Sequence, residues 1–133
     1  MNALGRHLLV ELYDCDVAVI NNLDVVKKVL LEAAERARAT VVDVVFHAFS
    51  PFGISGVVVI AESHLSVHTW PEHKYAAVDV FSCSDGLQVA EATRYLIERF
   101  AAQRASIVEV QRGMFLGSGV PKVSTGVEAL NPA

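Results

Sequence analysis

The sequence predicts an α+β fold, a two-layer α/β sandwich in which helices pack on one face of a mostly antiparallel sheet. Several short segments alternate between apolar and polar residues, which is the period of a half-buried strand. Two longer segments repeat apolar residues three and four positions apart, as amphipathic helices do. The order strand, helix, strand occurs twice, in residues 6–49 and 75–110, without convincing sequence identity between the halves. Two layers allow strands and helices to bury their apolar faces against each other.

The first half begins with a strand and continues with a helix. The strand, residues 6–13, has apolar residues on one face and a mixed set on the other: Leu8, Val10 and Leu12 against His7, Leu9 and Glu11. The helix begins after Asn21 or Asn22, either of which is a good cap, and ends near Arg38. Its apolar face contains Val25, Val26, Val29, Leu30, Ala33, Ala34 and Ala37.

A hairpin is expected next. Residues 40–49 form a β-branched strand with apolar even positions, and residues 56–61 form a second apolar strand. The tetrapeptide at residues 50–53, Ser-Pro-Phe-Gly, is a turn signal between them. Alternation resumes after Ser63 and is interrupted at Pro71, so one face of this strand carries His64, Ser66, His68 and Trp70.

The second half has a strand at residues 75–83, a helix at residues 87–102 and a last strand at residues 106–110. Residues 117–133 contain three glycines and two prolines without periodicity. We therefore expect a single domain, residues 1–116, followed by a flexible tail, residues 117–133.

The composition limits the possible functions. A chain of 133 residues is long enough for one domain. Its net charge of −4, with Lys and Arg scattered over the helices, gives no basic stripe, so no nucleic-acid partner is expected. The longest apolar run, Val57–Ala61, is far shorter than the ~20 residues of a membrane helix, so no membrane partner is expected either. Without the features of a signal peptide at its start, the chain is expected to be cytoplasmic.

The hydrophobic content of 53% is high for a monomer of this size, because a small domain leaves much of its surface exposed. We therefore expect at least a homodimer that covers apolar surface. Cys15 and Cys83 are expected to be free thiols, since the cytosol is reducing.

Polar and reactive side chains crowd into residues 61–83. This stretch contains His64, His68 and His73, the only tryptophan, Trp70, and Cys83. In a chain otherwise dominated by Val, Ala and Leu, such density indicates a functional site.

The run from Glu62 to Glu72, ESHLSVHTWPE, and the run from Tyr75 to Cys83, YAAVDVFSC, closely resemble the small prokaryotic S-adenosylmethionine decarboxylase proenzymes. The resemblance extends to residues 5–11, GRHLLVE, and residues 55–60, SGVVVI, and so covers nearly all of the chain before the tail. It implies that the chain cuts itself between Glu62 and Ser63, and that Ser63 becomes a pyruvoyl cofactor. The processed protein would then be a homodimer, or a larger assembly, of cleaved αβ protomers with chains 1–62 and 63–133.

The resemblance also assigns roles to other residues. His68 would be the base that removes the α-proton of residue 63, and Ser55 would support the cleavage intermediate. Cys83 would donate a proton to the substrate α-carbon after carbon dioxide leaves. Without the resemblance, the sequence would indicate that His68 is a hydrogen-bonded strand histidine and that Ser55 is a turn residue before Gly56. Cys83 would be a small buried side chain.

The implied substrate is S-adenosylmethionine, and the implied product is the aminopropyl donor of spermidine synthesis. Phe49, Trp70 and Glu72 resemble the residues that hold the adenosyl group, by aromatic stacking and by a carboxylate contact to the ribose. Trp70 and Glu72 are expected to complete the pocket of the neighbouring subunit. The pyruvoyl group would form a Schiff base with the substrate amine, so neither pyridoxal phosphate nor a metal is expected.

The chain departs from the family pattern at two places. His73-Lys74 stands where the family has an aromatic residue or glycine, and Ser84 follows Cys83 where glycine is common.

Three other functional interpretations stay open at this point. They are a pyruvoyl-dependent arginine or ornithine decarboxylase of the same fold, a metal-binding or structural protein, and a regulatory homologue without activity. The metal site would use His64, His68, His73 and Cys83. Spacings of four and five residues are seen among zinc ligands, but His64 and His68 lie in a β-branched strand and His73 follows a proline, which argues against such a site.

Overall fold

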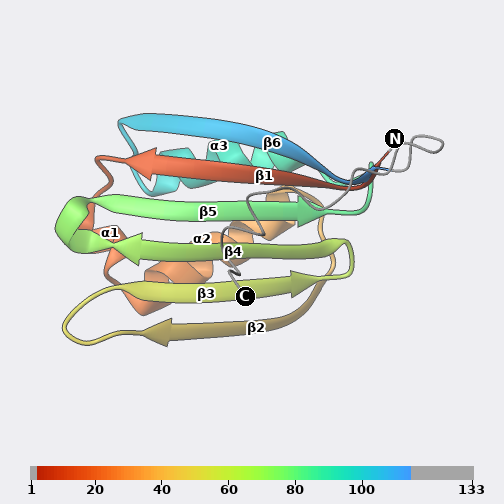
Figure 1. The fold of residues 1–133 in the computed structure, drawn as a ribbon. Coiled ribbons are helices and arrows are strands. Elements are labelled where there is room, and N and C mark those ends of the chain that lie inside the picture. The colour runs from red at the N-terminus through yellow and green to blue at the C-terminus, as the bar shows by residue number, and fades with distance from the viewer. Residues whose placement is uncertain (1–2, 115–133) are drawn as a thin grey trace, which may run out of the picture.

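The computed structural model describes residues 3–114. Its strands and helices form two layers, as the period-two alternation and the helical periodicity predict. Six strands form one sheet in the order β2-β3-β4-β5-β1-β6, with every neighbouring pair antiparallel. Helices α2 and α3 pack on one face of this sheet (Figure 1). The predicted α+β class is therefore confirmed. The elements are β1 (Ala3–Tyr13), α1 (Val17–Ile20), α2 (Leu23–Arg36), β2 (Val41–Ala48), β3 (Ile54–Ile60), β4 (Ser63–Trp70), a 3₁₀ turn (Pro71–His73), β5 (Tyr75–Ser82), α3 (Val89–Arg99) and β6 (Arg104–Met114).

The helices bury the residues that their periodicity predicts. Helix α2 begins at Asn22, whose side-chain oxygen accepts a hydrogen bond from the backbone N–H of Val25 at 3.1 Å, so the second candidate cap is the one used. It ends two residues before the predicted Arg38, which has a left-handed φ of 63°. The core between the layers contains Val26, Val29, Leu30, Ala33 and Ala34 of α2, Ala92 and Leu96 of α3, and Leu8, Val10, Leu12, Leu65, Val67, Val78 and Val80 of the sheet.

Several boundaries differ from those expected. Strand β6 was expected over residues 106–110 but spans residues 104–114, because it pairs along almost the whole of β1. Residues 111–114 carry no apolar alternation, so only this pairing defines them as strand. Strand β3 begins at Ile54 and so includes Ser55. The short helix α1, which was not predicted, begins where Asp16 accepts a hydrogen bond from Ala18 N–H at 2.9 Å.

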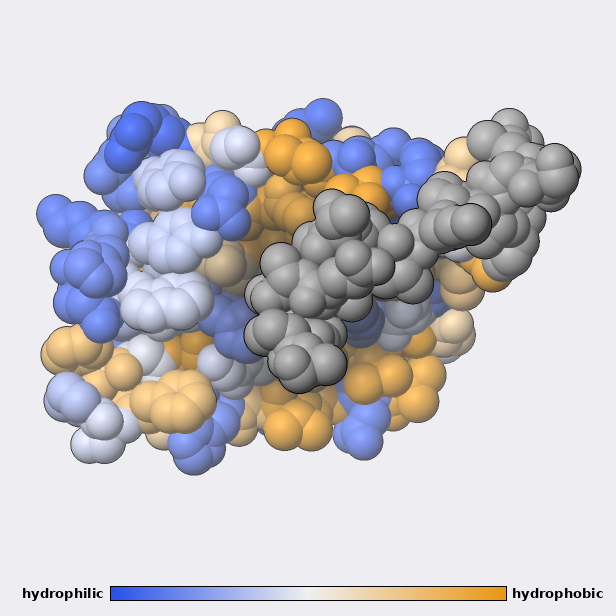
Figure 2. All heavy atoms as spheres, viewed as in Figure 1, coloured by the Kyte–Doolittle hydropathy of each residue, from blue (hydrophilic) through white to orange (hydrophobic). Residues whose placement is uncertain are grey.

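The face of the sheet opposite α2 and α3 is called the open face here. No helix among residues 3–114 covers it, and Figure 2 views the molecule from this side, with apolar surface over β2 and β3. Because directly paired residues share a face, the registers place His7, His64, Ser66, His68 and Asp79 together on it. Exposed apolar residues of this face include Leu9, Val45, Val57, Val59, Trp70, Val108 and Val110.

The predicted flexible tail, residues 117–133, lies outside the described residues. The helices of residues 3–114 are all too short or too polar to cross a membrane.

Candidate active site

The predicted cleavage bond lies in the tight turn between β3 and β4. Ile60 pairs with Ser63 across this turn, so Ala61 and Glu62 are its two central residues. Ser63 has a φ of 147°, a backbone conformation that residues with a side chain rarely adopt. Such a conformation costs on the order of 1–3 kcal/mol and persists only where the surroundings impose it. The hydroxyl expected to attack therefore belongs to a residue with a strained backbone.

Hydrogen bonds hold Glu62 from two sides. Its carbonyl oxygen accepts from the backbone N–H of Cys83 at 2.9 Å and from the Cys83 thiol at 3.1 Å. Its carboxylate accepts from the backbone N–H of Thr40 at 3.1 Å, and the Thr40 carbonyl accepts from Ala61 N–H at 2.8 Å. Two donors on one carbonyl oxygen polarise the carbonyl and stabilise the negative charge that nucleophilic attack creates there.

A second group of predicted residues lies where β3 begins and β4 ends. Ser55 pairs directly with His68, and the Ser55 hydroxyl lies 2.8 Å from Nδ1 of His68. A cavity of about 350 Å³ adjoins this pair. The three residues expected to hold the adenosyl group all line it, together with Ser55 and His68. Its complete lining is Phe49, Phe52, Gly53, Ser55, His68, Thr69, Trp70 and Glu72.

These two groups are far apart within one chain. Ser63 and His68 are five residues apart on the extended strand β4, which separates their Cα atoms by about 16 Å. Ser55 is paired with His68 and is therefore equally distant from Ser63. The chain thus brings Glu62, Ser63 and Cys83 together at one end of the open face. It brings Ser55, His68 and the cavity together at the other end.

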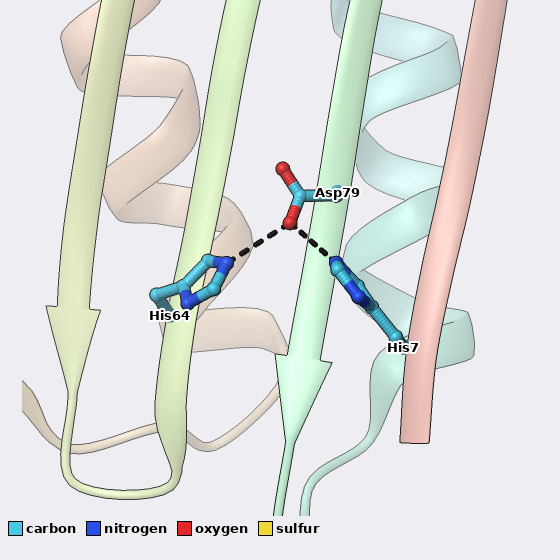
Figure 3. A group of neighbouring side chains, drawn as sticks. All are labelled: His7, His64 and Asp79. Carbon is cyan, nitrogen blue, oxygen red and sulfur yellow. Dashed lines mark hydrogen bonds and ion pairs between the residues drawn. The ribbon is translucent and has the colours of Figure 1, made fainter. Parts of the chain in front are cut away.

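A third group lies on the open face between β4, β5 and β1. Asp79 accepts hydrogen bonds through Oδ2 from Nε2 of His7 at 2.6 Å and from Nε2 of His64 at 2.9 Å (Figure 3). Its other oxygen, Oδ1, accepts from the hydroxyl of Ser66. Nδ1 of His7 lies 3.0 Å from a guanidinium nitrogen of Arg112. We call these five residues the Asp79 network.

The hydrogen bonds of this network fit two imidazoles that donate to the Asp79 carboxylate better than they fit a metal site. Within residues 3–114, His7, His64 and Asp79 are the one group of three potential ligands close enough to share an ion, with their ligand atoms within 4.8 Å of one another. An imidazole bound to a metal through Nε2 carries its proton on Nδ1, but Arg112 can only donate to that atom. The other set considered from the sequence, His64, His68, His73 and Cys83, does not come together in this part of the chain.

An aromatic row lies beside the cavity. The ring of Trp70 lies 5.3 Å from that of Tyr75, which stacks at 5.4 Å on Tyr13. The Tyr75 hydroxyl donates a hydrogen bond to the carboxylate of Glu11. Burial, and then this bond to an anion, raise the pKa of Tyr75 above its ordinary value. Tyr75 is therefore a neutral donor at physiological pH.

The two cysteines differ in environment. Cys15 is 3% exposed, and burial raises the pKa of its thiol to about 11. Cys83 is exposed, and its thiol donates a hydrogen bond to the Glu62 carbonyl. Both are free thiols, as expected.

The two departures from the family pattern occupy turns. Lys74 has a φ of 52°, a left-handed conformation that glycine adopts without steric cost. Ser84 accepts a hydrogen bond from Ser82 through its carbonyl and one from Gly86 N–H through its hydroxyl. Neither residue lines the cavity.

Sequence reasoning missed Glu11, Tyr75 and Asp79 as members of the site. Each is a polar residue in a strand whose other face is buried. Asp79 in particular interrupts a strand of mostly apolar residues, and that interruption was the available signal.

Comparison with known proteins adds independent evidence. A family model described as S-adenosylmethionine decarboxylase matches residues 6–113. An S-adenosylmethionine decarboxylase proenzyme of Acetivibrio thermocellus is 55% identical over 115 residues, covering 86% of this chain and 93% of the relative. One from Thermodesulfovibrio yellowstonii is 54% identical over 114 residues, covering 86% and 84%. The crystal structure of the adenosylmethionine decarboxylase from Aquifex aeolicus superposes with a TM-score of 0.80 at 33% identity, covering 92% of this chain and all of that one.

Proposed function

The chain belongs to the S-adenosylmethionine decarboxylase family and has the function of its proenzymes, and from this premise we propose which of its residues perform that function. The chain cuts its own backbone between Glu62 and Ser63, and Ser63 becomes the pyruvoyl cofactor that a proenzyme of this family implies. The observation that carries this proposal is the strained Ser63 beside a carbonyl that accepts two hydrogen bonds from Cys83.

The cleavage chemistry follows from this arrangement. The Ser63 hydroxyl attacks the Glu62 carbonyl carbon, its proton passes to the Ser63 nitrogen, and the C–N bond breaks to leave an ester. A base then removes the α-proton of residue 63, and the Cβ–O bond breaks to release the Glu62 carboxylate. The dehydroalanine that remains takes up water and loses ammonia, which leaves a keto group at the new terminus.

The pyruvoyl group, once formed, supplies an electron sink for the carboxylate that leaves the substrate, so pyridoxal phosphate is not needed. Around it, Cys83 has the position to donate a proton. Its thiol already points at the carbonyl of the cleavage bond, and it is exposed to an incoming substrate. Cys15 is buried with a raised pKa and takes no part.

The base requires a second copy of the chain. His68 lies about 16 Å from Ser63 along its own strand, beyond the reach of any proton transfer. If two open faces pair about a two-fold axis that runs across the strands, each end of one sheet meets the opposite end of the other. His68 and Ser55 of one subunit then serve Ser63 of its partner. The exposed apolar residues of the open face support this pairing, since they are the surface that a homodimer would cover.

The cavity is the binding site of the adenosyl group. S-adenosylmethionine has a flat adenine and a sulfonium cation, and Phe49 and Trp70 offer aromatic faces to both. Glu72 can accept hydrogen bonds from the ribose hydroxyls, which arginine and ornithine lack. Both aromatic side chains are exposed in the single chain, at 52% for Phe49 and 42% for Trp70, as ligand-binding faces would be.

Intact mass in denaturant tests the cleavage. We expect fragments of residues 1–62 and 63–133, the second blocked to Edman chemistry. One uncut chain after prolonged warming would reject the pyruvoyl cofactor. Incubation of the processed protein with carboxyl-labelled S-adenosylmethionine, arginine and ornithine, each separately, tests the substrate. Faster carbon dioxide release from either amino acid would favour the amino-acid decarboxylase instead.

Co-expression of two inactive chains tests the shared site. A His68→Ala chain retains Ser63, and a Ser63→Ala chain retains His68. We expect the His68→Ala chain to be cut in the mixture, because its partner supplies the imidazole. The matched control replaces the second chain with a Ser63→Ala/His68→Ala double variant, which should give no cutting. Equal cutting in the two mixtures would reject the shared site while leaving self-cleavage intact.

A further inference from the structure

The Asp79 network joins three strands through one carboxylate. Asp79 lies on β5, between β4, which carries His64 and Ser66, and β1, which carries His7. Both oxygens of the carboxylate accept hydrogen bonds, two on Oδ2 and one on Oδ1. All of these side chains lie on the open face, and Figure 3 shows His7, His64 and Asp79 pointing toward one another there. The Asp79 side chain is 22% exposed.

The surrounding groups set the direction of these hydrogen bonds. A guanidinium has donors and no acceptor, so Nδ1 of His7 must accept from Arg112. The Nε2 atom of His7 therefore carries the proton and donates to Asp79. The ring of Phe81 lies 5.0 Å from His7 and 5.8 Å from His64, so it packs beside both imidazoles. The two rings are thus restrained by packing as well as by hydrogen bonds.

This network restrains the residue that follows the cleavage bond. His64 comes directly after Ser63, and Asp79 holds its ring. On the other side of the bond, Glu62 is held by Thr40 and Cys83. A positive φ at a serine relaxes unless both flanking residues are fixed, because the strain persists only where the surroundings impose it. Ser63 satisfies this condition.

We propose that Asp79 is a positioning residue for self-cleavage: through His64 it fixes the start of β4, so that Ser63 keeps the strained backbone that brings its hydroxyl to the Glu62 carbonyl. This inference rests on the proposed cleavage at Ser63. Asp79 does not touch the reacting atoms. It acts through the imidazole of His64, which serves as a hydrogen-bond donor and not as a base.

The experiment measures the first-order rate of cutting in freshly made Asp79→Asn protein. An amide has one acceptor oxygen and presents N–H donors at the other position, so it cannot accept from His7, His64 and Ser66 together. We expect the rate to fall by about 10- to 100-fold, the scale of effect for small misplacement of reacting groups. Asp24→Asn is the matched control, since Asp24 is an exposed residue in the first turn of α2, on the helical side of the sheet, and it should cut at the wild-type rate.

A second pair of variants separates positioning from chemistry. In His64→Gln the side-chain amide nitrogen can replace the Nε2 donor, whereas His64→Leu has no donor. We expect His64→Gln to cut within a few-fold of the wild-type rate and His64→Leu to cut as slowly as Asp79→Asn. If the two variants are equally slow, a hydrogen-bond donor at position 64 does not restore cutting and the proposal is wrong.

Stability and assembly are measured in a Ser63→Ala background, in which every chain stays uncut. We expect Asp79→Asn to keep the cooperative unfolding and sedimentation of its parent there. Failure to fold, loss of the parent's assembly, or cutting at the wild-type rate would each overturn the proposal. If the unchanged chain itself were never cut, the proposed function would fail first, so the two failures are distinguishable.

Discussion

The two ends of the open face are built differently although the same strands form both. At the β3–β4 turn, the backbone of Ser63 is strained and the Glu62 carbonyl accepts two hydrogen bonds from Cys83. At the opposite end, Ser55 and His68 adjoin a cavity lined by aromatic rings, with no labile bond beside them. We call the first the reaction end, because it contains the bond proposed to be cut. We call the second the recognition end, because it contains the cavity proposed to bind the adenosyl group.

Under the proposed roles, one chain contains every required residue and still lacks a complete site. Antiparallel pairing places Ser55 opposite His68, and the same pairing keeps both about 16 Å from Ser63. A second copy, related by a two-fold axis, is a simple way to bring unlike ends together. Substitution of Ser63 and substitution of the cavity residues Phe49 and Glu72 should therefore fail in different assays.

The largest effect is expected at the reaction end. Ser63→Ala removes the hydroxyl of the residue that directly follows the Glu62 carbonyl, so we expect cutting to be abolished. Mass analysis after prolonged incubation checks this result. Ser106→Ala, which removes an exposed hydroxyl from β6, is the control and should be cut normally. A Ser63→Ala chain that still splits at the same bond would mean that the nucleophile is wrongly assigned.

The second effect separates cutting from turnover at the same end. Cys83→Ala loses the thiol donor to Glu62 but keeps the backbone N–H at 2.9 Å, so we expect it to be cut to completion. Turnover of S-adenosylmethionine should then fall by ~10² to 10⁴, the usual loss on removing a positioned proton donor. Carbon dioxide release from fully cut protein is the measurement. Normal turnover would leave Cys83 with a purely structural role.

A smaller effect is expected at the recognition end. Phe49→Ala and Glu72→Gln remove contacts to the adenosyl group worth about 0.5–2 kcal/mol each, so kcat/KM should fall by about 2- to 30-fold. Self-cleavage should be unchanged, because the proenzyme cuts itself without substrate. Glu98→Gln, an exposed change on α3, is the matched control for the loss of charge. A cleavage defect in either cavity variant would contradict the separation between the two ends.

Much of this arrangement could be predicted from the sequence. Alternation correctly placed His64, Ser66 and His68 on one face of β4, and helical periodicity identified the buried face of α2. The separation of Ser63 from His68 could have been calculated from their spacing, but nothing in the sequence showed which end of the sheet holds the cavity. Register decides that, and register depends on contacts between distant strands.

The Asp79 network could not be predicted for the same reason. His7 and Asp79 are 72 residues apart, and only the pairing of β1 with β5 brings them to 2.6 Å. The extra length of β6 likewise comes from its partner and not from its own alternation. Local patterns therefore predict which residues of a strand share a face. They do not predict which residues of other strands lie beside them, because strand pairing depends on tertiary structure.

The smallest effect concerns the aromatic row at the recognition end. The pKa of Tyr75 is raised in the folded chain by burial and by its bond to Glu11, so the folded protein holds this proton at pH values where the unfolded chain has lost it. A raised pKa contributes stability that is fully present below the unfolded value of about 10 and declines as the pH rises above it. We therefore expect the unfolding midpoint of the Ser63→Ala protein to fall between pH 9 and pH 11, and Tyr75→Phe to make this fall shallower. The buried thiol of Cys15, whose pKa is raised to about 11, contributes a decline in the same direction and remains in both proteins, so the difference between them isolates Tyr75. Thermal unfolding followed by circular dichroism across this pH range is the measurement, and identical slopes would mean that the bond from Tyr75 to Glu11 does not stabilise the fold.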